Sequence, residues 1–415
     1  MLKNANWTLF HDWSGVDSEA YYARYTPDLL AAFQEAQTQS NHRIAQESAS
    51  DLALIHRFYA DKSITHVVQI GIGGSSLGTQ MLYTALRRLI PQDRQKRVAF
   101  ISNLDTDDAD LILANLPVSQ TVFIIVSKSG TTEETQQNLA IVQAYNIQPD
   151  RLIYITSKKS ALDKSGSQVC YLDESIGGRY AITSGVSSVL IGIALHPDLM
   201  TAVRAGATDM HAYACYKPDQ NMALTLALIT ACHAQVYPTS LIIPYSQALC
   251  YFPDYAQQLL CESNGKAYTH AGTTVSEKTS PLVVGGIGTN VQHAVFQLLH
   301  DGTVITPVLF IMSQYSQLRH HAQPAVRAHI MAQLSLFRAK NKPVLALRCT
   351  RLTATTIGNL IALYENLAVF QGLLWGLNPF DQPGVEAGKQ LARNIVANQV
   401  PPEFQAYTQY LEAIL

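Results

Sequence analysis

Residues 65–78 read THVVQIGIGGSSLG, in which a short apolar run passes directly into a glycine-rich segment. The run THVVQI has the length and the β-branched content of a buried strand, and a helical pattern follows the glycines. Glycines let the backbone turn sharply and leave amide groups free, and the start of a helix favours an anion. This stretch therefore predicts a strand, a tight turn and a helix in succession.

Two interpretations of this turn stay open, namely phosphate binding and a structural turn without a ligand. A dinucleotide-binding fingerprint that begins at Gly71 would require glycine or alanine at position 76, where Ser76 stands. The lysine of a nucleotide-binding P-loop is also missing from this stretch. The turn is therefore not assigned to a nucleotide.

Similar apolar runs recur along the chain, each separated from the next by enough residues for a helix. They are RVAFIS (97–102), TVFIIV (121–126), RLIYIT (151–156), SLIIPY (240–245), PLVVGG (281–286), ITPVLFIM (305–312) and PVLALR (343–348). Strands that alternate with helices pair in parallel through βαβ units. The sequence therefore predicts an α/β fold with two doubly wound parallel sheets and helical N- and C-terminal segments.

The same pattern predicts the order of the domains. We expect a helical lead-in (1–60), a first α/β domain (61–185), connecting helices (186–235), a second α/β domain (236–355) and a C-terminal helical segment (356–415). The lead-in is assigned to helix because apolar residues recur at helical spacing in DLLAAFQEA and in SDLALIHRFYA.

The composition argues against several classes of protein. The chain has 415 residues, and its 29 Lys and Arg against 31 Asp and Glu lack the basic excess of nucleic-acid-binding proteins. The longest apolar stretches fall short of the ~20 residues of a membrane-spanning helix, and the N-terminus lacks a signal-peptide pattern. The six cysteines form no CxxC pair. We therefore expect a cytoplasmic protein with no nucleic-acid partner and no membrane segment.

The segment SKSGTTEET (127–135) directly follows a predicted strand, at the carboxyl end where open α/β sheets bind ligands. Its hydroxyl groups belong to Ser127, Ser129, Thr131 and Thr132. The ordinary interpretation is a helix N-cap followed by first-turn carboxylates. We favour phosphate binding because a cap needs one hydroxyl group and this loop has four.

Two further stretches carry charged residues beside glycines. Arg179 follows a glycine pair in IGGRYAITSG (176–185), and Glu262 lies between apolar residues and a turn in QQLLCESNGK (257–266). A carboxylate held partly out of water can act as a general base. Taken singly, however, an arginine such as Arg179 ordinarily forms an ion pair at the surface, and a carboxylate such as Glu262 is ordinarily solvated.

The last two stretches each combine a turn with the start of a helix. His293 follows a Gly-Thr-Asn turn in GTNVQHAVFQLLHDGT (288–303), and Gln382 and Lys389 lie in NPFDQPGVEAGKQLA (378–392). Taken singly, the histidine is ordinarily structural and the lysine solvated.

Together, these six stretches resemble the glucose-6-phosphate isomerase (phosphoglucose isomerase) family. The matching motifs are, in order, GIGGSSLG, SKSGTTEET, GGRY, ESNGK, GTNVQH and FDQPGVEAGK, which span residues 71–389. ESNGK combined with GTNxQH and QxGVExGK is specific to that family, whereas SKSGTT alone indicates a sugar-phosphate isomerase domain. The segment before GTN departs from the family's usual Trp-Gly-Glu-Pro, because residues 284–287 read VGGI. The resemblance implies two sugar-isomerase (SIS) domains.

The resemblance also implies roles for particular residues. Glu262 would be the base, Arg179 would stabilise the intermediate, and His293 with Lys389 would open the sugar ring. The residues that would bind the substrate and its phosphate are Gly74, Ser75, Ser127, Ser129, Thr132, Gln258 and Gln382.

The activity implied by the resemblance is reversible isomerisation of glucose 6-phosphate and fructose 6-phosphate, in glycolysis and gluconeogenesis, through ring opening and a cis-enediol. No metal or organic cofactor is expected, and His320, His321 and His329 form no HExxH pattern. The expected partners are a sugar phosphate and a second copy of the chain, in a homodimer with shared active sites. The alternatives are a related isomerase that also accepts mannose 6-phosphate and a non-catalytic phosphosugar-binding module.

Overall fold

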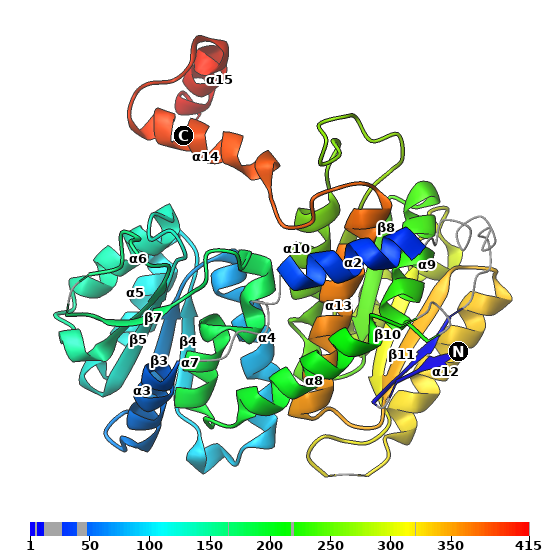
Figure 1. Cartoon of the computed structure of the whole chain (residues 1–415), viewed down its shortest axis with the longest axis horizontal. Helices are drawn as coiled ribbons and strands as arrows, with labels where there is room; N and C mark the ends of the chain where they lie inside the picture. Colours follow the sequence, from blue (N-terminus) through cyan, green and yellow to red (C-terminus); the bar gives the residue numbers. More distant parts are fainter. Residues whose placement is uncertain are drawn as a thin grey trace.

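The computed structural model describes residues 1–4, 6–11, 27–39, 48–164, 166–216, 220–319 and 321–414. Two lobes lie side by side, each built around a β-sheet (Figure 1). Both sheets have a parallel core covered by helices, which confirms the predicted α/β fold.

The first lobe contains a parallel sheet with the strand order β4-β3-β5-β6-β7. Its strands are β3 (His66–Ile70), β4 (Arg97–Ile101), β5 (Thr121–Val126), β6 (Leu152–Thr156) and β7 (Gln168–Tyr171). Every residue of β5 is buried, because helices cover both faces of the sheet there. On the outer face these are α5 (Thr106–Ala114) and α6 (Glu133–Gln143).

The second lobe contains a sheet with the strand order β1-β2-β11-β10-β8-β9. Its strands are β1 (Leu2–Lys3), β2 (Trp7–Phe10), β8 (Thr239–Pro244), β9 (Leu282–Gly285), β10 (Val308–Ser313) and β11 (Val344–Cys349). The strands β8 to β11 are parallel, and α11 (Gly288–Asp301) and α12 (Pro324–Ala339) cover their outer face.

The prediction of a helical lead-in over residues 1–60 is partly wrong. Helices are confirmed at α2 (Pro27–Gln39) and α3 (Ala49–Ala60). The first residues instead form β1 and β2, and β2 pairs antiparallel with β11 at the edge of the second sheet. Trp7 is 1% exposed and donates its ring N–H to the carbonyl of Thr356, so this strand belongs to the core. Residues 5, 12–26 and 40–47 of the lead-in lie outside the described ranges.

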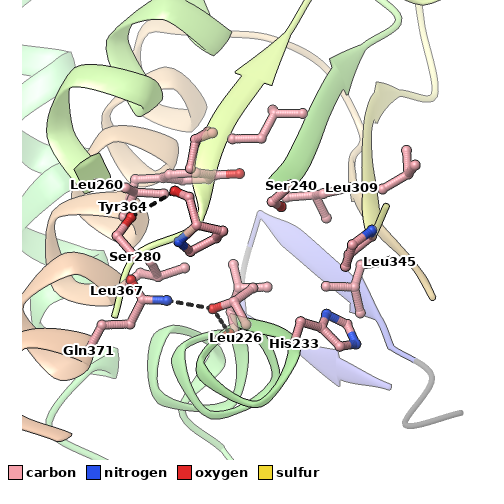
Figure 2. Close-up of a pocket in the computed structure, with 16 residues that line it drawn as sticks. Leu226, His233, Ser240, Leu260, Ser280, Leu309, Leu345, Tyr364, Leu367 and Gln371 are labelled. Carbon is pink, nitrogen blue, oxygen red and sulfur yellow. Dashed lines mark hydrogen bonds between the residues drawn. The ribbon is translucent and has the colours of Figure 1, made fainter. Parts of the chain in front are cut away.

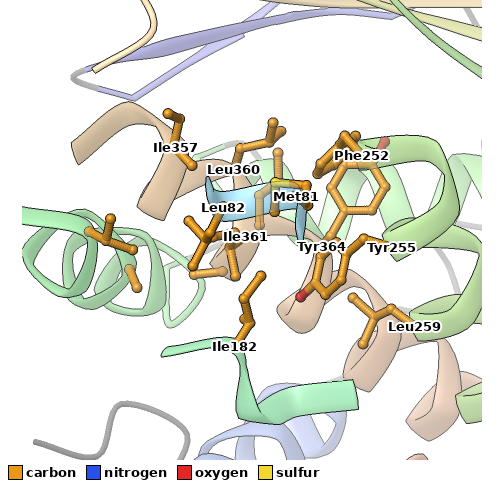
Figure 3. Close-up of a cluster of buried hydrophobic side chains, with 14 of the residues drawn as sticks. Met81, Leu82, Ile182, Phe252, Tyr255, Leu259, Ile357, Leu360, Ile361 and Tyr364 are labelled. Atoms are coloured by element: carbon orange, nitrogen blue, oxygen red, sulfur yellow. The ribbon is translucent and has the colours of Figure 1, made fainter. Parts of the chain in front are cut away.

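Helices that pack between the two sheets join the lobes. They include α4 (Leu77–Leu86), α7 (Gly185–Ala194), α8 (Leu199–Tyr213), α9 (Met222–Val236), α10 (Phe252–Asn264) and α13 (Ala354–Leu374). Met81 and Leu82 of α4 lie among side chains of α10 and α13, and Ile182 lies close to the same cluster (Figure 3). This shared core fixes α10 of the second lobe against loops of the first.

The helix α13 is buried over nearly its whole length because other elements surround it. Among the described residues it is long and apolar enough to cross a membrane, but 89% of its most apolar window is buried inside the protein. Its Phe370 ring stacks on Phe33 of α2 at 3.9 Å between centroids. Burial of this extent is typical of a core helix in a globular protein.

The chain ends in α14 (Pro383–Val396) and α15 (Pro402–Glu412), which project from the body (Figure 1). Neither helix has a buried residue, although Val396, Tyr407 and Leu411 are large and apolar.

Candidate active site

Two glycine turns meet where the lobes join. The turn η2 (Gly73–Ser75) follows β3, and η7 (Gly178–Thr183) lies beside it. A Cβ atom on Gly74 would lie 2.2 Å from the carbonyl carbon of Gly178, so no side chain fits at position 74. A Cβ atom on Gly73 would lie 3.1 Å from Nε2 of Gln258 on α10. The predicted ligand-binding turn therefore lies between η7 and α10.

Arg179 is the most deeply buried cation of this region. The whole residue is 3% exposed, and its guanidinium group is held by the protein on several sides. Nε donates to Oγ of Ser263 at 2.7 Å, and Nη1 donates to Oε1 of Gln382 at 3.0 Å. Nη2 donates to the carbonyls of Pro379 and Asp381 at 2.7 and 2.9 Å. The group is therefore fixed in place, and it is not a surface ion pair.

Glu262 faces this arginine. Its Oε1 lies 3.3 Å from Nη1 of Arg179, and its Oε2 accepts a hydrogen bond from Nε2 of Gln258 at 3.1 Å. Gln258 and Glu262 are four residues apart and so share one face of α10, while Phe252, Tyr255 and Leu259 of the same helix lie in the core (Figure 3). The Glu262 side chain remains 25% exposed, so a ligand can reach its carboxylate.

Lys266 was not predicted as a site residue, although it belongs to the ESNGK motif. Its Nζ lies 2.7 Å from Oδ1 of Asp381 and donates to the carbonyls of Ser263 and Asn378. Burial lowers the pKa of Lys266, while its hydrogen bond to Asp381 acts in the opposite direction. Lys266 thus ties the end of α10 to the segment that holds Arg179 and Gln382.

The loop after β5 has hydroxyl groups that do not cap the helix. Thr132 is the N-cap residue of α6 but makes no side-chain capping bond, and its Oγ1 lies 2.9 Å from Oγ of Ser127. Ser129 accepts hydrogen bonds from the backbone and side chain of Thr131. Gly130 has φ +70, a conformation that favours glycine. The ordinary interpretation as a cap therefore does not account for these hydroxyl groups.

A pocket of about 510 Å³ opens beside this loop. Ser75, Ser129 and Thr132, three of the residues predicted to bind phosphate, all line it. The structure thus brings together two loops that are more than 50 residues apart in the sequence.

His293 and Lys389, the residues predicted to open the sugar ring, lie on helices other than α10, which carries Glu262. His293 is exposed on α11, and the Lys389 side chain is 58% exposed on α14, where it pairs with Glu386 at 3.1 Å. Within the described residues, no hydrogen bond or ion pair joins either one to Glu262. Among the described residues of one chain, the Glu262 carboxylate is therefore bonded to Gln258 and Arg179, and to neither His293 nor Lys389.

Another cavity lies between α9, α13 and the second sheet (Figure 2). Apolar side chains form most of its walls, and none of the predicted site residues lines it. Burial lowers the pKa of His233 in its wall to about 4, so the ring is neutral near pH 7. This cavity therefore offers no charge that would hold a phosphate dianion.

The described residues contain no group of three His, Cys, Asp or Glu residues arranged to hold a metal ion. His320, which precedes His321 in the sequence, lies outside the described residues.

Comparisons with known proteins give a consistent result. The sequence model of the family "Phosphoglucose isomerase" matches residues 53–339 and 314–409. The glucose-6-phosphate isomerase of Treponema pallidum (strain Nichols) is 38% identical over 380 residues, which cover 84% of this chain and 71% of the relative. That of Chlamydia caviae is 36% identical over 381 residues, 85% of this chain and 72% of the relative.

Solved structures agree with these sequence matches. The crystal structure of a glucose-6-phosphate isomerase from Chlamydia trachomatis D/UW-3/Cx has a TM-score of 0.91 at 30% identity and covers 100% of this chain and 93% of that one. A tagatose-6-phosphate ketose/aldose isomerase from Escherichia coli has a TM-score of 0.53 at 14% identity, covering 86% of this chain and 97% of that one, which shows a likeness of fold alone.

Proposed function

This chain belongs to the phosphoglucose isomerase family and interconverts glucose 6-phosphate and fructose 6-phosphate, and we propose that Glu262 and Arg179 perform the proton-transfer step. The observation that carries this proposal is the 3.3 Å contact between Oε1 of Glu262 and Nη1 of the buried Arg179. The turn that contains Gly74 and Ser75 connects this pair to the hydroxyl-lined pocket, because Gly74 lies against the backbone of Gly178 and Arg179 while Ser75 lines the pocket.

Glu262 transfers the proton between two neighbouring carbon atoms. Its carboxylate removes the proton from C2 of the open-chain aldose, which leaves a cis-enediolate with negative charge on O1. The hydroxyl proton of O2 then moves to O1, the protonated carboxylate returns its proton to C1, and O2 becomes the carbonyl oxygen of the ketose. One base can serve both carbons because C1 and C2 are adjacent in the planar intermediate, so a carboxylate on one face of it reaches both. The Glu262 side chain is partly exposed, which leaves room for a substrate beside the carboxylate.

Arg179 stabilises the negative charge that develops on the enediol oxygens. Its contacts with Ser263, Gln382 and Pro379 hold the guanidinium group before the substrate arrives, so no reorganisation is needed during the reaction. Since this charge is larger in the transition state than in the substrate, the interaction accelerates the step rather than only tightening binding.

The hydroxyl groups around the pocket hold the substrate phosphate. Ser129 and Thr132, with Ser75 from the neighbouring turn, line the pocket and donate hydrogen bonds to its oxygens. The buried Ser127 does not line the pocket and contributes through Thr132, whose Oγ1 lies 2.9 Å from its Oγ. Gly74, Gln258 and Gln382 lie toward Arg179 and Glu262 and therefore approach the sugar. Fixing the phosphate at one end places C1 and C2 of the sugar at the carboxylate.

Removal of single hydroxyl groups should weaken phosphate binding. We expect Ser129→Ala and Thr132→Val each to raise the dissociation constant of inorganic phosphate, because a hydrogen bond to a charged group contributes about 1.5–3 kcal/mol, or about ten- to hundredfold. Isothermal titration calorimetry measures the effect, with Ser119→Ala, an exposed hydroxyl group before β5, as the matched control. Unchanged constants in both variants would return this loop to a structural role.

Ring opening uses His293 and Lys389, and we place them at the site through a homodimer. His293 is exposed on α11, and the helices α14 and α15 leave apolar side chains in solvent that a second subunit would cover. In a two-fold dimer each subunit lends the residues that it borrows. His293 then acts at the Glu262 of the neighbouring subunit, in a cytoplasmic enzyme whose six cysteines are free thiols.

A coupled assay tests this function directly. We expect purified protein to convert fructose 6-phosphate into glucose 6-phosphate with a chelator present, and a panel that includes mannose 6-phosphate separates the related isomerase activity. Binding of both sugar phosphates without turnover would instead identify a non-catalytic module. Activity lost on chelation and restored by a divalent metal would contradict the metal-free mechanism.

A further inference from the structure

The pocket beside the β5 loop extends past the residues assigned to the substrate phosphate. Its far wall is formed by residues 157–160, which follow β6, and includes Ser157, Lys158 and Lys159. No role in the isomerisation accounts for this segment. Its chemistry is that of an anion site, since it combines a hydroxyl group with two ammonium groups.

Ser157 is buried in this wall without a hydrogen-bond partner for its side chain. The residue is 6% exposed, and among the described residues nothing pairs with its Oγ. Its backbone N–H donates to the carbonyl of Lys128 at 3.1 Å, which joins the β6 loop to the β5 loop. Buried hydroxyl groups are normally paired, so an unpaired one that lines a pocket points to a ligand oxygen.

Lys158 and Lys159 place positive charge at the rim. Lys159 has φ +63, a strained conformation for lysine, and its backbone N–H donates to Oδ2 of Asp163 at 2.7 Å. The Lys158 ammonium group lies 5.7 Å from the centre of the Tyr171 ring. Neither lysine makes an ion pair within the described residues, although the exposed Glu174 also lines the pocket.

The order of the strands gives the direction in which a ligand would extend. β5 lies between β3 and β6, so the loops follow one another as the β3 turn, the hydroxyl loop and the lysine loop. Neighbouring strands are about 4.8 Å apart. The sugar extends from the hydroxyl loop toward the β3 turn and Glu262, so the lysine loop lies on the opposite side of the phosphate.

We propose that this pocket binds a diphosphate group, with one phosphoryl group at Ser129 and Thr132 and the second at Ser157, Lys158 and Lys159. The proposal rests on the assignment of the hydroxyl loop to the substrate phosphate. Because the first phosphoryl group takes the place of the substrate's own, the diphosphate inhibits isomerisation competitively. The established substrates carry one phosphate and leave the lysine side of the pocket to solvent.

Binding of inorganic pyrophosphate and inorganic phosphate tests the proposal. Calorimetry on the wild type should show that pyrophosphate binds at least about tenfold more tightly than inorganic phosphate. This ratio corresponds to the binding free energy of one added hydrogen bond to a charged group. Lys158→Ala combined with Lys159→Asn, which keeps a residue that tolerates positive φ, should abolish this advantage and leave phosphate binding within about twofold. Ser157→Ala should weaken pyrophosphate selectively without lowering Tm.

Lys164→Ala is the control, because Lys164 is an exposed lysine of the same connection that does not line the pocket. An equal loss of pyrophosphate binding in this control, or equal affinities of the wild type for the two anions, would overturn the proposal. Binding of ADP shows whether the natural ligand is a diphosphate ester or inorganic pyrophosphate. If ADP binds as tightly as pyrophosphate and this binding requires Lys158 and Lys159, the ligand is a diphosphate ester; if ADP binds more weakly, the ligand is inorganic pyrophosphate.

Failure of this inference can be distinguished from failure of the proposed function. If Thr132→Val weakens phosphate binding while the lysine variants leave the affinity for pyrophosphate unchanged, the hydroxyl loop binds phosphate as proposed and the second subsite is wrong. If Thr132→Val changes the affinity for neither phosphate nor pyrophosphate, the assignment of the hydroxyl loop to the substrate phosphate is itself wrong.

Discussion

Replacing Glu262 with glutamine should lower kcat by about 10²- to 10⁴-fold, the contribution typical of a general base. The amide has nearly the same shape, so Gln258 and Arg179 keep a partner at this position. We therefore expect the inhibition constant of a phosphorylated sugar analogue to change only a few-fold. Steady-state kinetics in both directions measure the two effects separately.

Two controls accompany this variant. Asp110→Asn removes an exposed carboxylate of the outer helix α5 and should leave kcat unchanged. Because Glu262 neutralises part of the charge of a buried arginine, the Tm of Glu262→Gln must also be compared with that of the wild type. A folded Glu262→Gln protein that keeps more than a tenth of the wild-type kcat would exclude Glu262 as the base.

The second large effect is recovery of activity when two inactive variants are mixed. Glu262→Gln and His293→Ala should each be nearly inactive alone. After subunit exchange, about half of the dimers are mixed, and in a shared-site dimer each mixed dimer has one site with both defects and one site with neither. About a quarter of all sites are then intact, so we expect activity to return toward about a quarter of the wild-type value.

Subunit exchange must be shown independently, by mass spectrometry of isotope-labelled and unlabelled chains. If exchange is complete and activity does not recover, His293 acts in the same chain as Glu262. That result would remove the dimer from the mechanism, and the exposed position of His293 would then require a movement of α11 within one subunit.

The parallel strands other than β7 could be predicted because each is a short apolar run with a helix-length connection, as in TVFIIV at β5. The strand β2 could not be predicted. Trp7 to Phe10 pair with Ala346 to Cys349 of β11, more than 300 residues away, and no local pattern carries that information. The strand β7 could not be predicted either, because Gln168–Tyr171 is a four-residue edge strand with neither a long apolar run nor a clear alternation of polar and apolar residues.

The placement of Arg179 and Glu262 beside each other also required the tertiary structure. Their motifs predicted the residue types, but the burial of Arg179 depends on carbonyl groups of Pro379 and Asp381, about 200 residues away. The role proposed for Ser157 could not be predicted, because a serine directly after a strand has no distinctive sequence pattern. Its missing hydrogen-bond partner is visible only in the folded chain.

The central claim is that Glu262 carries the proton between C1 and C2, and hydrogen exchange with solvent tests it most directly. Wild-type protein with fructose 6-phosphate in D₂O should introduce deuterium at C2 of the glucose 6-phosphate formed, which NMR detects, because a protonated carboxylate exchanges with solvent. The account predicts that Glu262→Gln loses this incorporation together with isomerisation. Incorporation by Glu262→Gln at the wild-type rate would contradict it and assign the proton transfer to another group.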